Sequence, residues 1–144
     1  MGGKLSGFSQ TTANGTASVA IGQSTQSLGQ YSISIGSANT ASGSMAVAIG
    51  NLNEVSGDYA VSMGYRTKAS SANQYVFGKD NIEDTNRTYL FILGNGTSAS
   101  AKSNAMTVDW NGNITLTGGI TLGKGTINEV TLSATELKQL KTLI

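Results

Sequence analysis

Glycine recurs with a period of 14 residues through the first half of this sequence. One set of glycines closes a series of short alternating runs, at Gly22, Gly36, Gly50, Gly64 and Gly78. A second set lies halfway between, at Gly15, Gly29, Gly43 and Gly57, with Ser71 in the place of a fifth. A small, turn-permissive residue therefore recurs about every seven positions, and a fixed period of this kind indicates a stack of similar coils.

The residues before each closing glycine alternate between branched apolar and small side chains. In the run that ends at Gly50, Val47 and Ile49 share one face of a strand, and Ala46 and Ala48 share the other. The same alternation recurs in the runs that contain Val19, Ile21, Ile33, Ile35, Val61 and Met63. The residues that follow each closing glycine are mostly polar and form the second half of the period. Two short strands and two turns per 14 residues predict an all-β solenoid, since frequent glycine and a period of two exclude a helix here.

The two strand faces can be assigned in two ways. A face restricted to Ala and Ser suggests the close approach of another backbone. We therefore expect Val and Ile to fill the coil interior, and small residues such as Ala46 and Ala48 to meet neighbouring protomers. The reverse assignment, with small residues inside and Val and Ile between chains, stays open. In both cases a single coil is too small to bury both faces of its strand, so the pattern predicts a homo-oligomer.

The repeated pattern Gly-x-x-Ser/Ala-Val/Ile-Ala/Ser-Ile-Gly resembles the head repeat of YadA-type trimeric autotransporter adhesins. The resemblance implies a left-handed parallel β-roll, assembly as a homotrimer, and binding to host matrix or cell-surface molecules. One position departs from the adhesin pattern. The Asn that often opens the motif is replaced by Ala17, Tyr31, Met45 or Tyr59, so the resemblance does not extend to matrix-protein binding.

The chain divides into four predicted segments. Residues 1–78 form the β-roll head, 79–87 a polar connector, 88–132 a β-rich neck or assembly unit, and 133–144 a helix. At the end of the roll, Tyr75 and Phe77 are predicted to cap the open end. The apolar run 88–94 reads as a strand that is buried on both faces. Asn111-Gly112 predicts a two-residue β-hairpin turn between strands at 106–110 and 113–116.

The C-terminal half carries a second resemblance and a helix signal. Residues 94–98 and 103–113 resemble a segment of prophage tail and fibre proteins, which implies a trimeric virion component near the host-recognition tip. Ser133 and Glu136 have the spacing of a helix capping box. The helix that follows places Leu137, Leu140 and Ile144 at the spacing of a coiled-coil seam. It is too short to be stable alone, so we expect it to serve as a trimerisation helix.

Composition argues against an enzyme and against a cofactor. The 144 residues include no Cys and no His, which removes the thiol nucleophile, the commonest general base and the commonest metal ligand. The net charge is +1 and the charged residues are scattered, so neither nucleic acid nor membrane insertion is expected. Residues 118–124 match part of a phosphate-loop pattern, but a glycine turn is the favoured reading.

Two groups of charged residues are predicted to be structural. Asp80, Glu83 and Asp84 have no calcium-loop spacing, so we expect them in a solvated connector and predict no metal site. Glu54 and Lys68 lie one period apart and should form an exposed pair on adjacent coils.

The predicted function is that of a non-enzymatic, trimeric phage tail or fibre component, located in the virion, that attaches to a bacterial host surface. The alternative is the head of a bacterial surface adhesin. Because the first ten residues lack a secretory signal and no segment could span a membrane, we expect either an excised head or a head used where neither is needed. The predicted partner is a cell-surface glycan or protein. The candidate ligand-binding residues are exposed aromatic and basic side chains, at Tyr31, Tyr59, Tyr65, Arg66 and Lys68.

Overall fold

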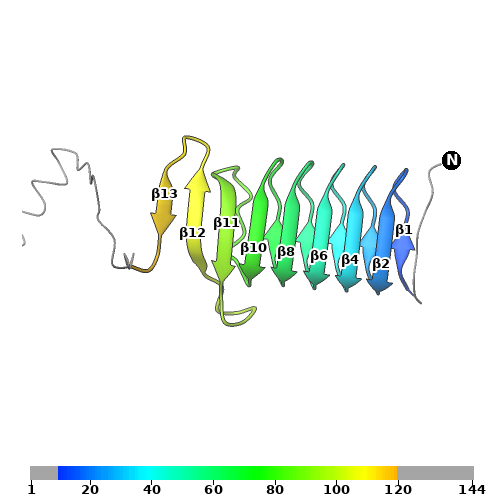
Figure 1. The fold of residues 1–144 in the computed structure, drawn as a ribbon, viewed down its shortest axis with the longest axis horizontal. Helices are drawn as coiled ribbons and strands as arrows, with labels where there is room; N and C mark the ends of the chain where they lie inside the picture. The colour runs from blue at the N-terminus through cyan, green and yellow to red at the C-terminus, as the bar shows by residue number, and fades with distance from the viewer. Residues whose placement is uncertain (1–9, 120–144) are drawn as a thin grey trace, which may run out of the picture.

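The computed structural model describes residues 10–119. It shows a row of coils, each with one long strand and one short strand (Figure 1). The long strands are β2 (Val19–Gln23), β4 (Ile33–Ser37), β6 (Val47–Asn51), β8 (Val61–Tyr65) and β10 (Tyr75–Lys79). The short strands are β1 (Thr12–Ala13), β3 (Gln26–Ser27), β5 (Thr40–Ala41), β7 (Glu54–Val55) and β9 (Lys68–Ala69). The predicted helix at 133–144, with Leu137, Leu140 and Ile144, lies outside the described residues.

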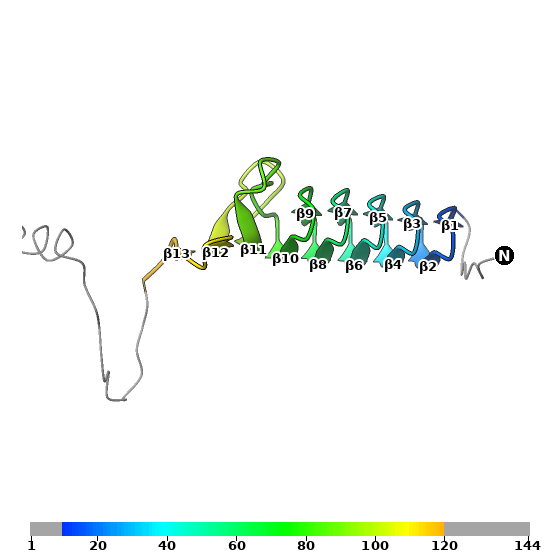
Figure 2. The same ribbon diagram turned by 90° about the horizontal axis from the view of Figure 1, so that it is seen from above.

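The long strands form one parallel sheet and the short strands a second, and Figure 2 shows the two sheets as separate rows along the roll. Each strand pairs with the strand one coil away in a register of 14 residues, so that Val19 pairs with Ile33 and Ile33 with Val47. The predicted all-β parallel solenoid with 14-residue coils is therefore confirmed.

The small residues fill the coil interior, so our first assignment of the strand faces is wrong. Ala20, Ala46 and Ala48 are completely buried, as are the serines in the same columns. Residues of the other face point outward and are half-buried or exposed: Val19, Ile21, Ile33, Ile35, Val47, Ile49, Val61 and Met63. The reverse assignment, which the sequence left open, is the observed one.

The narrowness of the coil explains why most of the side chains inside it are small. The Ser27 and Ser32 hydroxyl oxygens lie 2.6 Å apart across the interior, and those of Thr25 and Ser34 are also 2.6 Å apart. The two strand layers are thus close enough for the shortest polar side chains to meet. Branched apolar side chains are rare here: among residues 10–79 only Val55 and Val76 are completely buried, because protein interiors are packed without spare volume.

A column of buried amides holds successive coils together. The Asn39 amide nitrogen donates to the Ile35 and Gly50 carbonyls, both at 2.8 Å, and its oxygen accepts from the Asn53 backbone N–H at 2.9 Å. Asn53 repeats the arrangement one coil later, where its oxygen accepts from the Thr67 backbone N–H at 3.0 Å. These side chains satisfy backbone groups at the turns that no strand pairing reaches.

The turn glycines allow this close stacking. Gly36 has φ of +122°, and a Cβ added to it would overlap the carbonyl oxygen of Gly50. The equivalent Cβ on Gly50 would overlap the carbonyl oxygen of Gly64. Glycine is therefore required both for its backbone conformation and for the space it leaves.

The roll continues beyond the repeats through β11 (Tyr89–Asn95), which pairs in parallel with β10. Gly78 pairs with Gly94, 16 positions later instead of 14. Tyr75 and Phe77 therefore do not cap the roll. They lie in the outward columns, and the Phe77 ring stacks on Phe91 with centroids 5.7 Å apart. The strand β11 is not buried on both faces either, because Ile92 points inward and Leu93 is exposed.

The segment between β10 and β11 is not a solvated connector. Asp80, Asn81 and Asp84 are all buried. The Asp84 carboxylate accepts hydrogen bonds from the Tyr89 backbone N–H at 2.8 Å, the Asn86 backbone N–H at 3.1 Å and the Gln74 amide at 3.1 Å. The longer final coil thus folds around internal polar anchors, whose oxygens replace the backbone partners that regular coils supply.

The predicted hairpin is confirmed, but its loop has three residues and not two, because Trp110 lies outside the strand. The strands β12 (Asn104–Asp109) and β13 (Ile114–Leu116) pair antiparallel and extend the long-strand sheet past β11. Gly112 adopts φ of +83°, and its N–H donates to the Asp109 carbonyl at 3.1 Å. The Asp109 N–H donates to the Asn113 carbonyl at 3.0 Å, which gives a three-residue loop that ends in a left-handed glycine.

Candidate ligand-binding site

The structure places the predicted ligand-binding residues at opposite ends of the long strands. Tyr31 and Tyr59 occupy the turns that precede β4 and β8, where both have φ of +57° and are exposed. Tyr65 ends β8, and Arg66 and Lys68 follow it. The five residues therefore form two separate groups, and Arg66 and Lys68 of the second group line a cavity.

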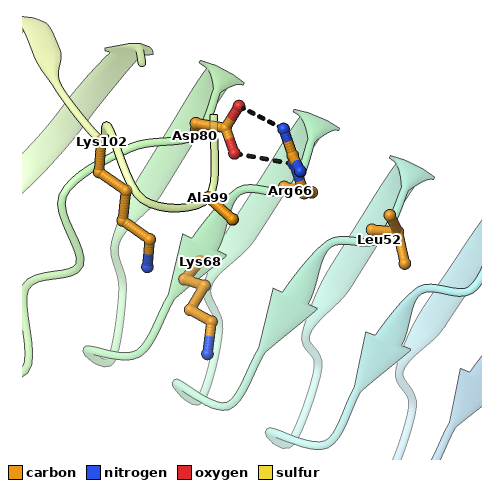
Figure 3. A pocket seen from close by; sticks show the side chains of 6 residues that line it. All are labelled: Leu52, Arg66, Lys68, Asp80, Ala99 and Lys102. Atoms are coloured by element: carbon orange, nitrogen blue, oxygen red, sulfur yellow. Dashed lines mark hydrogen bonds and ion pairs between the residues drawn. The ribbon is translucent and has the colours of Figure 1, made fainter. Parts of the chain in front are cut away.

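That cavity, which we call the junction pocket, lies at the carboxyl ends of the long strands, where the regular coils meet the loop between β11 and β12 (Figure 3). Its volume is about 230 Å³. Its lining residues come from three turns of the roll and from the loop: Leu52, Arg66, Lys68, Asp80, Ala99 and Lys102. Sequence analysis singled out Arg66 and Lys68 for ligand binding but missed Leu52, Ala99 and Lys102.

Arg66 is fixed by a buried carboxylate in the next coil. Its Nε lies 2.8 Å from Asp80 Oδ1, and its Nη2 donates to Asp80 Oδ2 at 3.0 Å. The guanidinium also lies 4.5 Å from the centre of the Tyr65 ring. A planar guanidinium held at two points has one orientation, and its remaining N–H groups stay available. The 14-residue spacing from Arg66 to Asp80 was the sequence signal for this pair.

Lys68 forms the predicted pair with Glu54, and the ammonium–carboxylate distance is 2.6 Å. Glu83 lies farther away, at 3.9 Å. The hydrogen bond to Glu54 raises the pKa of Lys68 above 10.5, and this effect outweighs the opposing effect of partial burial. Because the pair is largely exposed, it adds only a few tenths of a kcal/mol to stability. Its main consequence is that Lys68 stays charged and localised at neutral pH.

The β11–β12 loop is anchored to the last coils by backbone hydrogen bonds. The Gly96 N–H donates to the Lys79 carbonyl at 3.0 Å, and the Ser103 N–H donates to the Asp80 carbonyl at 3.1 Å. The Lys79 ammonium donates to the Thr97 carbonyl at 3.3 Å. These contacts hold Ala99 and Lys102 beside Arg66 and Lys68. The pocket wall is therefore fixed by the last coils and does not depend on a free loop.

Within residues 10–119, no three acidic, His or Cys side chains are grouped closely enough to hold a metal ion. The part of the chain that the structure describes also contains no helix with the length and apolarity needed to cross a membrane.

Comparison with known proteins identifies the repeats. The family described as YadA head domain repeat (2 copies) matches residues 9–25, 13–39, 27–53, 41–67 and 56–73. These overlapping matches span slightly less than half of the chain and end before β10. No curated protein matches the chain significantly. The regular part of the roll is therefore built from YadA-type head repeats, which are repeats of adhesins and not of an enzyme family.

Proposed function

We propose that this chain is the head of a homotrimeric bacterial surface adhesin, and that it attaches cells to a host surface without catalysing a reaction. The observation that carries the proposal is the outward apolar face of a roll built from adhesin repeats. This reading corresponds to the alternative in the sequence analysis. The repeats favour it over the phage tail component that we predicted first.

The apolar face supports a trimer because it is too continuous for an isolated chain. Its two columns of apolar side chains cross every long strand of the roll. Tyr75, Phe77, Phe91 and Leu93 extend them onto β10 and β11. Ile21 is 42% exposed and Tyr75 is 43% exposed in the single chain. Contiguous apolar surface of this kind marks an interface, because protein surfaces rarely leave it in water. Three copies packed around a common axis would cover it.

The remaining surfaces of the roll suit attachment. Tyr31 and Tyr59 recur along one edge of the coils, and Tyr65, Arg66 and Lys68 lie at the opposite edge. We propose these residues as contacts for a cell-surface glycan or protein. A trimer presents each contact three times, and multivalent attachment raises apparent affinity by about 10²–10⁴-fold when the sites engage together. On this proposal the protein acts at the bacterial cell surface.

The test combines an assembly measurement with an attachment assay on the full chain. Light scattering should give a trimer at micromolar concentration. Fluorescently labelled protein should attach to cultured animal cells and should release no reducing ends from their glycans. The same attachment assay is run in parallel on intact bacterial cells. Attachment to bacteria alone would support the tail-fibre function instead, and a monomer without attachment to either surface would refute both.

A further inference from the structure

The junction pocket lies where the periodic coils meet a loop that does not repeat. Its floor belongs to the repeating coils, through Leu52, Arg66 and Lys68, but its wall comes from the β11–β12 loop, which no other coil has. Figure 1 shows this loop extending beyond the carboxyl ends of the strands at one end of the roll. A loop held on a rigid scaffold is a common place for a binding site. The loop thus gives this pocket a wall that the regular coils do not have.

The charges around the pocket favour an anion. Three of the six lining residues are cationic, and only Asp80 is acidic. Asp80 is matched by Arg66, and Lys68 lies against Glu54. Among residues 10–119, no carboxylate lies within 4.0 Å of the Lys102 ammonium. Lys79 lies 4.0 Å from Asp80 and Glu83 lies 3.9 Å from Lys68, so four cations meet three carboxylates around the pocket. The net charge there is positive, and Lys102 is the lining cation without a nearby carboxylate.

The two paired cations retain hydrogen-bond donors for a ligand. Asp80 engages one side of the Arg66 guanidinium, which carries five N–H donors in total. Lys68 has three donors, of which Glu54 takes the nearest. Figure 3 shows the Lys68 and Lys102 ammonium groups extending toward the same side of the pocket. Prepositioned donors around a small anion lose little side-chain entropy when the anion binds.

The remaining walls and the volume indicate the size of the ligand. Leu52 and Ala99 contribute apolar surface beside the charged groups. A cavity of about 230 Å³ is smaller than most sites for drug-sized ligands. One sugar ring fits this combination, because its C–H face can lie against Leu52 and Ala99 while an attached anionic group meets the lysines.

We propose that the junction pocket binds the acidic sugar unit of a surface polysaccharide, with Lys102, Lys68 and Arg66 contacting its carboxylate or phosphate group. This assignment rests on the attachment function proposed above and names its ligand class. A carboxylated sugar and a phosphorylated sugar present the same chemistry to the three cations. The experiment therefore includes both.

Titrations of the full chain by isothermal calorimetry or NMR would use glucuronic acid, glucose 6-phosphate, glucose and inorganic phosphate as probes. We expect at least one acidic sugar to bind about tenfold or more tightly than glucose, and more tightly than inorganic phosphate. The acidic sugar that binds best identifies the source. Raising the salt concentration should weaken its binding, since the attraction is partly screened.

Three variants connect the binding to the pocket. Lys102→Gln should weaken the acidic-sugar affinity about fivefold, and Ala99→Trp should abolish it by filling the cavity. Both positions are exposed, so neither change disturbs the core. Arg87→Gln is the matched control, because it removes an exposed cation that does not line the pocket and should leave affinity unchanged.

Equal binding of glucose and the acidic sugars would overturn the proposal. So would an affinity that Ala99→Trp does not reduce, or one that Arg87→Gln reduces as much as Lys102→Gln. These outcomes are separate from failure of the attachment function. A trimer that attaches to cells but binds no acidic sugar would refute only the pocket assignment, whereas sugar binding without attachment or trimer would refute the adhesin function.

Discussion

At the residue scale, the roll places non-glycine residues in the left-handed backbone region every seven positions. The series continues through both kinds of turn with φ between +46° and +70°: Gln10, Ala17, Ser24, Tyr31, Ala38, Met45, Leu52, Tyr59, Arg66, Asn73, Asp80 and Arg87. The glycine spacing predicted turns at this period. It did not predict that a side-chain-bearing residue would take the left-handed conformation two positions after each glycine. Of the residues at these positions, only Asn73 and Asp80 are types that favour it.

Met45→Asn should therefore stabilise the protein. Met45 has φ of +55° and is exposed, so the substitution removes little packing and supplies a residue that tolerates this conformation. The expected gain in the free energy of unfolding is up to about 1 kcal/mol, measured by urea denaturation. Met45→Val should have the opposite effect, because a β-branched residue is disfavoured there. If Met45→Asn destabilises the protein, the Met45 side chain makes a contact that the single chain does not show.

The carboxylate of Asp109 accepts the hydrogen bonds that hold the hairpin loop, so its pKa should be lower than the ordinary value. Hydrogen bonds from the Asn113 side chain at 2.8 Å and backbone at 2.9 Å, joined by one from the Asn111 N–H at 2.8 Å, lower the pKa of Asp109 below 3.8. A lowered folded-state pKa means that the carboxylate stabilises the hairpin above the unfolded value of 3.8. This contribution is lost as the pH falls through the lower folded-state value.

NMR titration of the Asp109 carboxyl carbon should accordingly give a midpoint below 3.8. Asn113→Ala is the matched variant, since it removes the side-chain donor and keeps the backbone donor; it should move the midpoint upward. Trp110, adjacent in the loop, offers fluorescence as a second reporter of the same transition. A midpoint that Asn113→Ala leaves unchanged would show that this hydrogen bond does not set the pKa.

At the element scale, the sequence predicted the coils but not which way their faces point. Alternation defines two faces and is symmetric between inside and outside, so Val47 and Ala48 could exchange roles without altering the pattern. The distance between the two strand layers breaks this symmetry, and no single strand encodes it. The amide column of Asn39 and Asn53 was visible only as two residues 14 positions apart.

The junction pocket was predictable only in part. Arg66 and Lys68 lie within the repeat, where the 14-residue period also places Asp80 and Glu54 on neighbouring coils. Lys102 lies in the β11–β12 loop, and its approach to Lys68 depends on how that loop folds back. Backbone hydrogen bonds from Gly96 and Ser103 decide this fold, and their partners cannot be read from side-chain identity.

Ala48→Leu tests the coil interior directly. Ala48 is completely buried between two strand layers, so three extra carbon atoms must displace backbone or side chains. Overpacking typically costs about 1–3 kcal/mol, and a rigid, narrow coil should fall at the upper end. Urea denaturation monitored by circular dichroism measures the loss.

Val47→Ile is the control for this substitution. It enlarges the neighbouring residue on the outward face, where the adjacent coil already carries Ile33 in the same column. We expect its unfolding midpoint to stay close to that of the original protein. Equal destabilisation by the two changes would mean that the interior is no more crowded than the outward face.

At the scale of the whole molecule, the small interior and the apolar exterior have one cause. A coil that is two thin layers deep has no room for a core of large side chains, so the residues that would normally form such a core line its outer face. Among residues 10–119, Ile92 is the largest side chain that is completely buried, and it lies in the longer final coil. The apolar surface that stabilises most domains from within is therefore free to stabilise contact between chains.

Ile49→Lys tests whether this face is the proposed trimer interface. The substitution places a charge in the middle of the apolar columns, where each of three copies would bury it without a partner, at a cost of several kcal/mol per trimer. Light scattering at micromolar concentration should show monomers or a much weaker trimer. Thr40→Lys adds the same charge to the outward side of the short-strand layer, next to Glu54, and should leave the trimer intact. A trimer that survives Ile49→Lys, or that Thr40→Lys disrupts equally, would locate the interface elsewhere on the roll.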